Sequence, residues 1–262
     1  MVTVTARVPV STGPDARRDG ARSALVWDTL QRVVAARAGH AGRAALDIVD
    51  VGGGTGGFAV PFAALGHNVT VVDPSPDALA GAQRRAAERQ VRLAAVQGDA
   101  DGLDHLVGEG AADLVICHSV LEYVDEPAAA MAAIARVLRP GATVSVLAAN
   151  AVAAVLNRAV SGRYEQARDL LASLDGAGSI GGAGEISADG RRRYTLAGLT
   201  ALIEGAGLRA GEAYGVRVFA GLLPTADPDP GAVSALAALE DAAAAYPALR
   251  DIAARLHVLG YR

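Results

Sequence analysis

DIVDVGGGTGGFAV, at residues 47–60, is the stretch from which the fold is most readily predicted. A short run rich in β-branched residues ends at Val51, and five glycines and one threonine separate it from the apolar residues 58–60. This order predicts a β-strand, a tight loop and the start of a helix, because glycine accepts the backbone angles of such a loop and leaves room for a ligand against the main chain. The loop N–H groups and the positive end of the helix dipole would then face that ligand. The sequence therefore predicts a nucleotide-like ligand here.

Two ligand classes fit the glycine spacing. Gly52, Gly54 and Gly57 match the dinucleotide pattern G-x-G-x-x-G. Asp50 with Gly52, Gly54 and Gly56 matches the pattern D-x-G-x-G-x-G of S-adenosylmethionine sites. Asp50 favours the second class, because a carboxylate at the strand end would repel a pyrophosphate but attract the ammonium of a methionine group. Asp50 could also cap the turn, and the two roles are compatible.

Strand-like and helix-like segments alternate from residue 44 onward, which is typical of a parallel sheet with helical crossovers. The expected strands are residues 45–51, 68–73, 91–97, 113–118 and 143–149, with helices at 56–65, 76–89 and 127–138. Further along, helical patterns cover 151–174, 195–208 and 231–255, an extended segment covers 209–222, and a last strand covers 255–262. We therefore expect an α/β, Rossmann-like fold with a mostly parallel seven-stranded sheet and helices on both faces.

The chain is predicted to form one core with additions at both ends. Residues 1–43 would form an N-terminal helical cap, and residues 44–150 would form the ligand-binding core. Residues 151–262 would supply substrate-side helices, a mobile loop and the last two strands of the same domain. The mobile loop is expected at residues 174–193, where glycine is frequent. The oligomeric state, monomer or homodimer, stays open at this point.

The charge distribution narrows the class of partner. All 24 basic residues are arginine, and the formal net charge is −4. Residues 1–46 carry seven arginines and three acids, whereas residues 47–150 carry six arginines and thirteen acids. This balance argues against bulk affinity for nucleic acid and predicts that a polyanion would approach the flanks of the chain.

Membrane and metal partners are not expected. The sequence shows no signal-peptide pattern and no window of about 18 uncharged apolar residues. Cys117 is the only cysteine, so no disulfide can form within the chain, and the five histidines show no ligand spacing. A reducing, cytoplasmic location is the expectation.

Acidic residues follow the second and third predicted strands. Asp73 ends the second strand, where its carboxylate could accept hydrogen bonds from both hydroxyls of a ribose. Asp99, with Ala100 beside it, follows the third strand and could bind the exocyclic amine and the edge of an adenine. Dehydrogenases do not usually place an aspartate there, so Asp99 favours S-adenosylmethionine.

The fourth strand leads into CHSVLEYVDEP (117–127) and, after a helix, LRPG (138–141). With DVGGGTG (50–56), these motifs resemble the S-adenosylmethionine-dependent methyltransferases of the class I fold. More closely, the chain is similar to the tRNA 5-carboxymethoxyuridine methyltransferases, which convert the carboxylate of that wobble-position uridine into a methyl ester. The motifs that carry the closer resemblance are ARSALVWDTLQRV (21–33), NA (150–151), RAVSGRYEQA (158–167), YGVRVF (214–219) and LHVLGYR (256–262).

The chain departs from that family's pattern at three places. Tyr123 replaces an expected tryptophan, and Ala149 replaces an expected aromatic residue. Arg191, Arg192 and Arg193 stand where a lysine-rich stretch is expected. These changes leave the methyltransferase assignment unchanged and bear on the exact RNA substrate.

The resemblance implies S-adenosylmethionine as cofactor, S-adenosylhomocysteine as product and tRNA as substrate. It implies that Arg22 reaches the methionine carboxylate and that His118 lies beside the sulfonium. The expected cofactor-binding residues are Arg22, Asp50, Gly52, Gly53, Gly54, Gly56, Asp73, Pro74, Asp99, Ala100 and His118. Asn150, Tyr164 and Arg217 are the candidates for holding the acceptor.

The acceptor decides whether a general base is needed. A carboxylate has an ordinary pKa of about 4, so it is ionised at neutral pH and needs no base. A hydroxyl on a small metabolite would need one, and His118 or Glu122 would then be the candidates. Glu122 also has a structural reading, as the residue that opens the next helix. A small-molecule O- or N-methyltransferase and a cofactor-binding regulatory protein without catalysis therefore stay open as alternatives.

Overall fold

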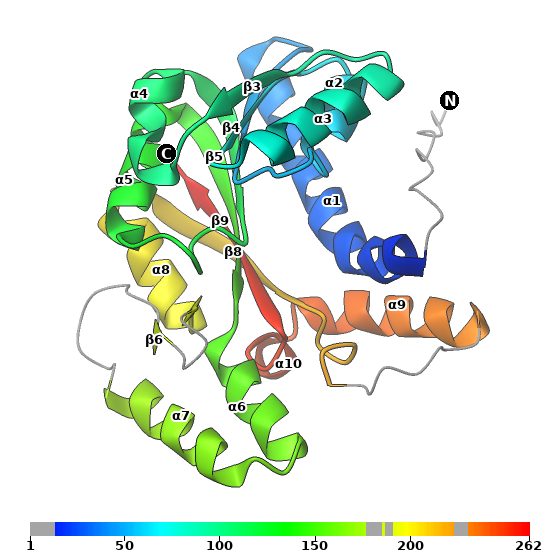
Figure 1. Cartoon of the computed structure of the whole chain (residues 1–262), viewed down its shortest axis with the longest axis vertical. Helices are drawn as coiled ribbons and strands as arrows, with labels where there is room; N and C mark the ends of the chain where they lie inside the picture. Colours follow the sequence, from blue (N-terminus) through cyan, green and yellow to red (C-terminus); the bar gives the residue numbers. More distant parts are fainter. Residues whose placement is uncertain (1–13, 177–184, 187–190, 223–229) are drawn as a thin grey trace.

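The computed structural model describes residues 14–176, 185–186, 191–222 and 230–262. At its centre is a seven-stranded sheet in the order β3-β2-β1-β4-β5-β9-β8 (Figure 1). The strands are β1 (Asp47–Val51), β2 (Asn68–Asp73), β3 (Ala94–Gln97), β4 (Ala112–His118), β5 (Leu138–Ala149), β8 (Arg209–Val216) and β9 (Arg255–Tyr261). A separate two-stranded pair joins β6 (Glu185–Ile186) and β7 (Arg192–Arg193).

The direction of the strands agrees with the predicted sheet. Strands β1 to β5 are parallel to one another, and β9 runs antiparallel between β5 and β8. Valine, isoleucine and leucine fill the central strands because helices cover both faces of a parallel sheet. The predicted mostly parallel seven-stranded sheet is therefore confirmed.

Helices cover both faces of this sheet (Figure 1). On one side lie α1 (Pro14–Ala41), α2 (Ala59–Ala64) and α3 (Pro76–Glu88), and on the other α4 (Leu103–Val107), α5 (Pro127–Val137) and α8 (Leu196–Gly205). Helix α1 packs Val26 and Leu30 against Ile48 of β1 and Ile116 of β4. These side chains are at most 1% exposed, so the α1 face of the sheet is a packed core.

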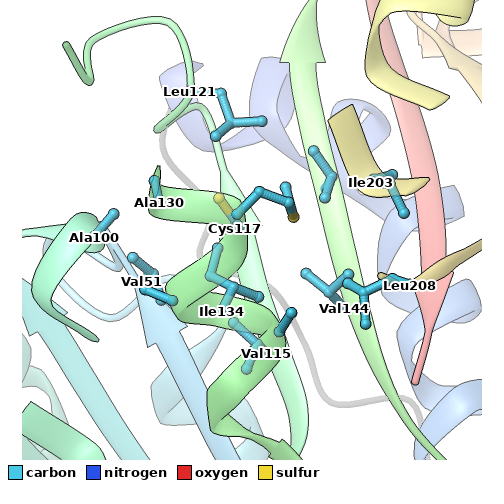
Figure 2. Close-up of a cluster of buried hydrophobic side chains, with 14 of the residues drawn as sticks. Val51, Ala100, Val115, Cys117, Leu121, Ala130, Ile134, Val144, Ile203 and Leu208 are labelled. Carbon is cyan, nitrogen blue, oxygen red and sulfur yellow. The ribbon is translucent and has the colours of Figure 1, made fainter. Parts of the chain in front are cut away.

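The larger core lies on the opposite face, between the sheet and helices α5 and α8 (Figure 2). Val115 and Val144 of the sheet meet Ile134 of α5 and Ile203 of α8, and all four are fully buried. Alternate residues of each strand enter this core because successive side chains point to opposite faces. The intervening residues of β4 and β5 face α1, where the polar side chains described below are found.

The remaining helices gather beyond one end of the sheet, where β5 leads into α6 (Figure 1). They are α6 (Ala151–Val160), α7 (Tyr164–Gly176), α9 (Pro230–Ala244) and α10 (Pro247–Arg250). Because parallel strands end at a common edge, the carboxyl ends of β1, β2, β4 and β5 point toward these helices. The fold thus places the predicted substrate-side helices next to the glycine loop's edge of the sheet.

Several elements differ from the sequence prediction. Strand β5 begins at Leu138 instead of residue 143, and the helical pattern predicted at 151–174 forms two helices, α6 and α7. The extended segment predicted to reach residue 222 ends as a strand at Val216, because Arg217 adopts a left-handed conformation (φ +61°) and starts a turn. Helix α2 begins at Ala59 instead of near residue 56, because the glycine loop continues up to that point. The short helices at Ala100–Gly102 and Leu103–Val107 were not predicted. The predicted mobile loop lies largely outside the described residues.

Candidate active site

The glycine loop joins β1 to α2 and is tied to the end of β2. The Gly52 N–H donates to the Val72 carbonyl at 2.7 Å, and the Gly54 N–H donates to Asp73 Oδ2 at 2.9 Å. Gly54 has a φ of +55°, and a Cβ added to it would meet no described atom within 4 Å. The left-handed angle explains why glycine stands there, and the open space leaves the backbone accessible to a ligand.

Asp73 is the link between the loop and the carboxyl end of β2. Its Oδ1 accepts a hydrogen bond from the Ser75 N–H at 2.9 Å, while Oδ2 accepts the one from Gly54. The side chain is only 8% exposed, so these two bonds hold its orientation. Each carboxylate oxygen keeps a second acceptor position, which suits the two neighbouring hydroxyls of a ribose.

Asp50 lies beneath the loop instead of on its open side. The residue is 3% exposed, and its carboxylate accepts a hydrogen bond from the Ala59 N–H at the start of α2, where the helix dipole favours a negative charge. A Cβ on Gly53 would come within 2.7 Å of this carboxylate, so only glycine fits there. Burial raises the pKa of Asp50 to about 7; the Ala59 N–H opposes the rise and the charge of Asp73 adds to it. The capping role is thus visible, and contact with an ammonium stays a prediction.

We expect Asp50 to make stability depend on pH near neutrality. Its pKa is higher in the folded than in the unfolded chain, so the folded state loses stability as the pH rises through about 7. Relative to Asp50→Asn, the wild-type protein should lose about 1.4 kcal/mol between about pH 6 and about pH 8. Denaturant unfolding of both proteins at the two pH values measures this, and parallel changes in the two would contradict the assignment.

The other predicted adenosine contacts lie at the ends of β2 and β3. The carbonyl of Pro74 accepts a hydrogen bond from the Gln97 side chain at 3.2 Å, which joins the two strand ends. Asp99 is exposed and precedes the short helix that begins at Ala100, without bonding to that helix through its carboxylate. Ala100, the first residue of that short helix, is buried. The structure therefore brings Asp73, Pro74 and Asp99 to one edge of the sheet.

His118 ends β4 and belongs to a chain of polar groups on the α1 face. Its Nε2 lies 2.8 Å from Ser145 Oγ, which in turn lies 2.7 Å from Nε2 of the fully buried His257. The ring of Phe58, just after the glycine loop, meets the His118 ring edge-to-face at 5.0 Å. Nδ1 of His118 is buried and has no hydrogen-bond partner among the described residues.

His118 and His257, the two histidines that Ser145 joins, are uncharged at neutral pH. Burial lowers the pKa of His118 well below its usual value, and nearby His257 and Arg255 add to the effect. Burial likewise lowers the pKa of His257 to about 4, with a smaller contribution from Arg32. The Ser145 hydroxyl has one proton to donate, so it can donate to one imidazole and accept from the other. Sequence reasoning missed Ser145 and His257, although both are polar residues within otherwise apolar strands.

Glu122 joins the turn after β4 to the end of β5. Its Oε1 accepts a hydrogen bond from the Ala149 N–H at 2.9 Å, and the side chain is 4% exposed. Burial raises the pKa of Glu122, with smaller opposing effects from nearby N–H groups and arginines. This geometry fits the structural reading, although Glu122 lies in a turn and α5 begins later, at Pro127.

Two of the three predicted acceptor residues have different surroundings from those expected. The Asn150 side chain is 2% exposed and caps α6: Oδ1 accepts from the Val152 N–H, and Nδ2 donates to the carbonyls of Asp251 and Ala253. These internal partners give Asn150 a structural role at the start of α6; Asn150 also lines a small pocket at the end of β5, and its contact with an acceptor stays a prediction. Tyr164 begins α7 and is 72% exposed.

Arg217 sits in a turn that a carboxylate organises. Its guanidinium donates to the Ala220 carbonyl at 3.3 Å. Glu240 of α9 accepts three consecutive backbone N–H groups that follow it, from Val218, Phe219 and Ala220, at 2.7–2.9 Å. This anchor, which was not foreseen, holds Arg217 in its left-handed conformation. Ser119, after β4, has a similar φ of +60°, so two strained residues follow strand ends at the same edge.

Three further expectations concern Arg22, membrane-spanning helices and metal sites. Arg22 lies in α1, but its side chain is outside the described residues. No helix among the described ranges is long and apolar enough to cross a membrane. Within the same part of the chain, no three or more His, Cys, Asp or Glu side chains are grouped to hold a metal ion.

Comparison with known families agrees with the strand order and the loop. Residues 49–146 match the family of the methyltransferase domain. This match identifies a methyltransferase domain within the chain, and the sheet order agrees with the Rossmann-like fold expected of the class I methyltransferases. The solved structure of a possible histamine N-methyltransferase from Thermotoga maritima covers 82% of this chain and 81% of its own, with a TM-score of 0.53 and 18% identity. That likeness concerns the fold alone.

Part of the chain is similar in sequence to two characterised methyltransferases. The tRNA 5-carboxymethoxyuridine methyltransferase of Escherichia coli (strain K12) is 32% identical over 150 residues, which cover 55% of this chain and 54% of that protein. The ubiquinone biosynthesis O-methyltransferase of Xanthomonas campestris pv. campestris (strain B100) is 34% identical over 125 residues, which cover 47% and 51%. The chain thus spans about half the length of the curated relatives it matches.

Proposed function

We propose that the chain is an active S-adenosylmethionine-dependent methyltransferase whose acceptor is the carboxylate of 5-carboxymethoxyuridine at the tRNA wobble position. The observation that carries the proposal is the glycine loop, in which the open, left-handed Gly54 is fixed to Asp73. The similarity to the Escherichia coli tRNA enzyme supports the choice of acceptor. A tRNA acceptor would place the reaction in the cytoplasm.

The described residues fit the cofactor in a definite order along the sheet edge. Asp73 would accept the ribose hydroxyls, Asp99 and Ala100 would meet the adenine, and Asp50 would lie nearest the ammonium. When bound, S-adenosylmethionine would supply an electrophilic methyl group. The remaining task of the protein is to align an acceptor oxygen with that methyl group, since a carboxylate is already ionised.

The low pKa of His118 bears on the choice of acceptor. A histidine whose pKa lies well below neutrality is a weak base, so it would remove a proton from a hydroxyl inefficiently. In buried Glu122, Oε1 accepts the Ala149 N–H, whereas Oε2 has no hydrogen-bond partner among the described residues, so Glu122 is the other candidate base. As far as His118 is concerned, an acceptor that needs no base therefore fits better than a hydroxyl.

A second candidate is a small-molecule O- or N-methyltransferase. The identity to the ubiquinone biosynthesis O-methyltransferase favours it, as does the acidic net charge. It would require a base other than His118, or an acceptor that is itself ionised.

A methylation assay with defined acceptors tests the proposal. Purified protein is incubated with S-adenosylmethionine and tRNA that carries 5-carboxymethoxyuridine, and the digested nucleosides are analysed by mass. We expect the methyl ester to appear at the wobble position and no methylation of tRNA that lacks the carboxymethoxy group. Transfer to small phenols or amines alone would establish the second candidate. Cofactor binding without transfer to any acceptor would indicate a regulatory protein.

We expect Arg217→Ala to separate cofactor binding from transfer. The guanidinium follows β8 in a turn held by Glu240, away from the glycine loop in the sheet order. If it grips the acceptor, its loss should reduce transfer by about 100-fold and change S-adenosylmethionine affinity by less than about two-fold. Arg217→Lys is the matched control and should retain part of the activity. An equal loss of binding and transfer would instead indicate a folding role.

A further inference from the structure

Three polar side chains form a hydrogen-bonded chain across neighbouring strands on the α1 face of the sheet. His118 of β4, Ser145 of β5 and His257 of β9 supply one group each, and these strands are adjacent in the sheet order. Ser145 and His257 are fully buried, whereas His118 is half-buried at the end of its strand. Burying polar groups in otherwise apolar strands is costly unless they are bonded, so the way these groups share their protons is restricted.

The hydroxyl of Ser145 limits how the protons are shared. Its Oγ lies 2.8 Å from His118 Nε2 and 2.7 Å from His257 Nε2, and it has no third hydrogen-bond partner among the described residues. A serine hydroxyl has a single proton, so it donates that proton to one ring and accepts the N–H of the other. A neutral imidazole carries one N–H, and the two rings must therefore be in opposite tautomers.

Two arrangements satisfy this rule, and they differ in the group left at each Nδ1. In the first, His118 donates from Nε2 and Ser145 donates to His257, so the proton of His257 lies on its Nδ1. In the second, His257 donates from Nε2 and Ser145 donates to His118, so the proton of His118 lies on its Nδ1. Both Nδ1 atoms are buried and lack a partner among the described residues, so each arrangement leaves one N–H unsatisfied.

The different burial of the two rings favours the second arrangement. A buried N–H without an acceptor is rare in folded proteins, because its desolvation is not compensated. His257 is 0% exposed on a strand between β5 and β8, so a ligand cannot reach an N–H on its Nδ1. His118 ends β4 beside the glycine loop, and the ring centroid of Phe58, which follows this loop, lies 5.0 Å from its own. Of the two rings, only that of His118 lies where a bound molecule can supply an acceptor.

We infer that Ser145 and His257 are positioning residues that hold His118 with its proton on Nδ1, so that His118 offers a hydrogen-bond donor to an oxygen atom of the methyl acceptor. The inference rests on the proposed function for the identity of that oxygen, which would belong to a carboxylate. The Nε2 lone pair of His118 then receives the Ser145 proton, so the ring has no free lone pair with which to act as a general base. His118 in this form suits an acceptor oxygen that is already ionised.

Nitrogen-15 nuclear magnetic resonance of the histidine rings tests the inference without tRNA or transfer. The chemical shifts of Nδ1 and Nε2 distinguish a nitrogen that carries a proton from one with a lone pair. With S-adenosylhomocysteine present at neutral pH, we expect the proton of His118 on Nδ1 and that of His257 on Nε2. His67 is the internal reference, because its Nδ1 accepts the Leu46 N–H at 3.3 Å and burial lowers its pKa, so its single proton lies on Nε2.

Variants of the chain separate this role from a structural one. Ser145→Ala removes the hydroxyl that donates to His118, and we expect it to produce a mixture of His118 tautomers and about ten-fold slower methylation of tRNA. His257→Gln keeps an N–H that can donate to Ser145 and should retain the His118 tautomer, whereas His257→Phe should lose it. Unchanged His67 signals show that a variant is folded, and if those signals are lost the wild-type spectrum decides alone.

The spectra and the methylation assay distinguish failure of the inference from failure of the proposed function. The opposite pair of tautomers or a mixture in the wild type would overturn the inference, as would an unchanged His118 tautomer in both Ser145→Ala and His257→Phe. The expected tautomers in a protein that methylates no tRNA would contradict the proposed function and leave the tautomer assignment standing. Methylation of tRNA by a protein with the opposite tautomers would contradict the assignment and leave the function standing.

Discussion

Gly54→Ala is expected to lower the affinity for S-adenosylmethionine by about 100-fold or more, equal to about 2.7 kcal/mol. The added Cβ would project into the open space above the loop, where the backbone must approach the ligand. The cost to stability should be only about 1 kcal/mol, since a left-handed alanine is strained but meets no described atom within 4 Å. Isothermal titration and thermal unfolding measure the two effects separately.

Gly110→Ala is the matched control for this strain. Gly110 has a φ of +58°, close to the +55° of Gly54, and an added Cβ there also meets no described atom within 4 Å. It precedes β4 and so lies at the opposite edge of the sheet from the glycine loop. We expect the same small loss of stability and unchanged cofactor affinity. Equal affinity losses in both variants would show that strain, and not ligand contact, explains the effect.

Asp113→Ala is expected to cost about 3–5 kcal/mol of unfolding free energy. Its fully buried carboxylate is surrounded by guanidinium groups: Arg37 at 3.1 Å, Arg43 at 2.5 Å and Arg139 at 2.8 Å. It also accepts the Asp47 N–H at 3.1 Å, at the start of β1. Removing the carboxylate would leave Arg43 and Arg139 with Asp47 as their carboxylate partner, and would take this acceptor from Arg37 and from the Asp47 N–H. Denaturant unfolding measures the loss.

The effect of Asp113 should also depend on pH. Burial alone would raise the pKa of Asp113, but the Asp47 N–H and the surrounding arginines outweigh burial and hold it below the usual value. A lowered pKa means that the stabilisation is present above about pH 4 and is lost as the pH falls further. The difference between wild type and Asp113→Asn should therefore shrink in acid. A constant difference would contradict this explanation.

Asp169→Ala is the control for surface charge. Asp169 pairs with Arg168 at 3.0 Å, but the two side chains are 69% and 76% exposed. Such pairs contribute little, so we expect a change below about 0.5 kcal/mol. A loss comparable to that of Asp113→Ala would show that deletion of any carboxylate, and not the buried cluster, sets the magnitude.

Strand and helix positions followed closely from local sequence patterns. The bounds of β2 agree with the prediction, and helix α5 ends one residue before the predicted position. These elements could be predicted because the periodic spacing of apolar residues in strands and helices is a property of residues that are close in sequence. The turn after Val216 was not predictable in this way, because the N–H groups of Val218 and Phe219 are bound by Glu240, more than twenty residues away.

Some site residues were likewise predictable from local sequence, whereas the surroundings of others depend on partners that are distant in sequence. The glycines, Asp73 and Asp99 were recognisable from their positions at strand ends, and the structure brings them to one edge of the sheet. Contact of Asn150 with the acceptor stays a prediction, whereas the bonds of its side chain to carbonyls about one hundred residues away were not predicted. The sequence around Asn150 does not indicate which carbonyls its side chain will bind.

The α/β architecture and the glycine loop followed from the sequence, and the same loop indicated the class of cofactor, since each depends on short-range spacing and on the backbone freedom of glycine. The tertiary structure alone decided which polar groups are buried together. Ser145 meets His118 from 27 residues away and His257 from 112 residues away. Glu240 meets the N–H groups of Val218, Phe219 and Ala220 from at least twenty residues away. Burial and charge pairing are properties of neighbours in space, and only the folded chain specifies those neighbours.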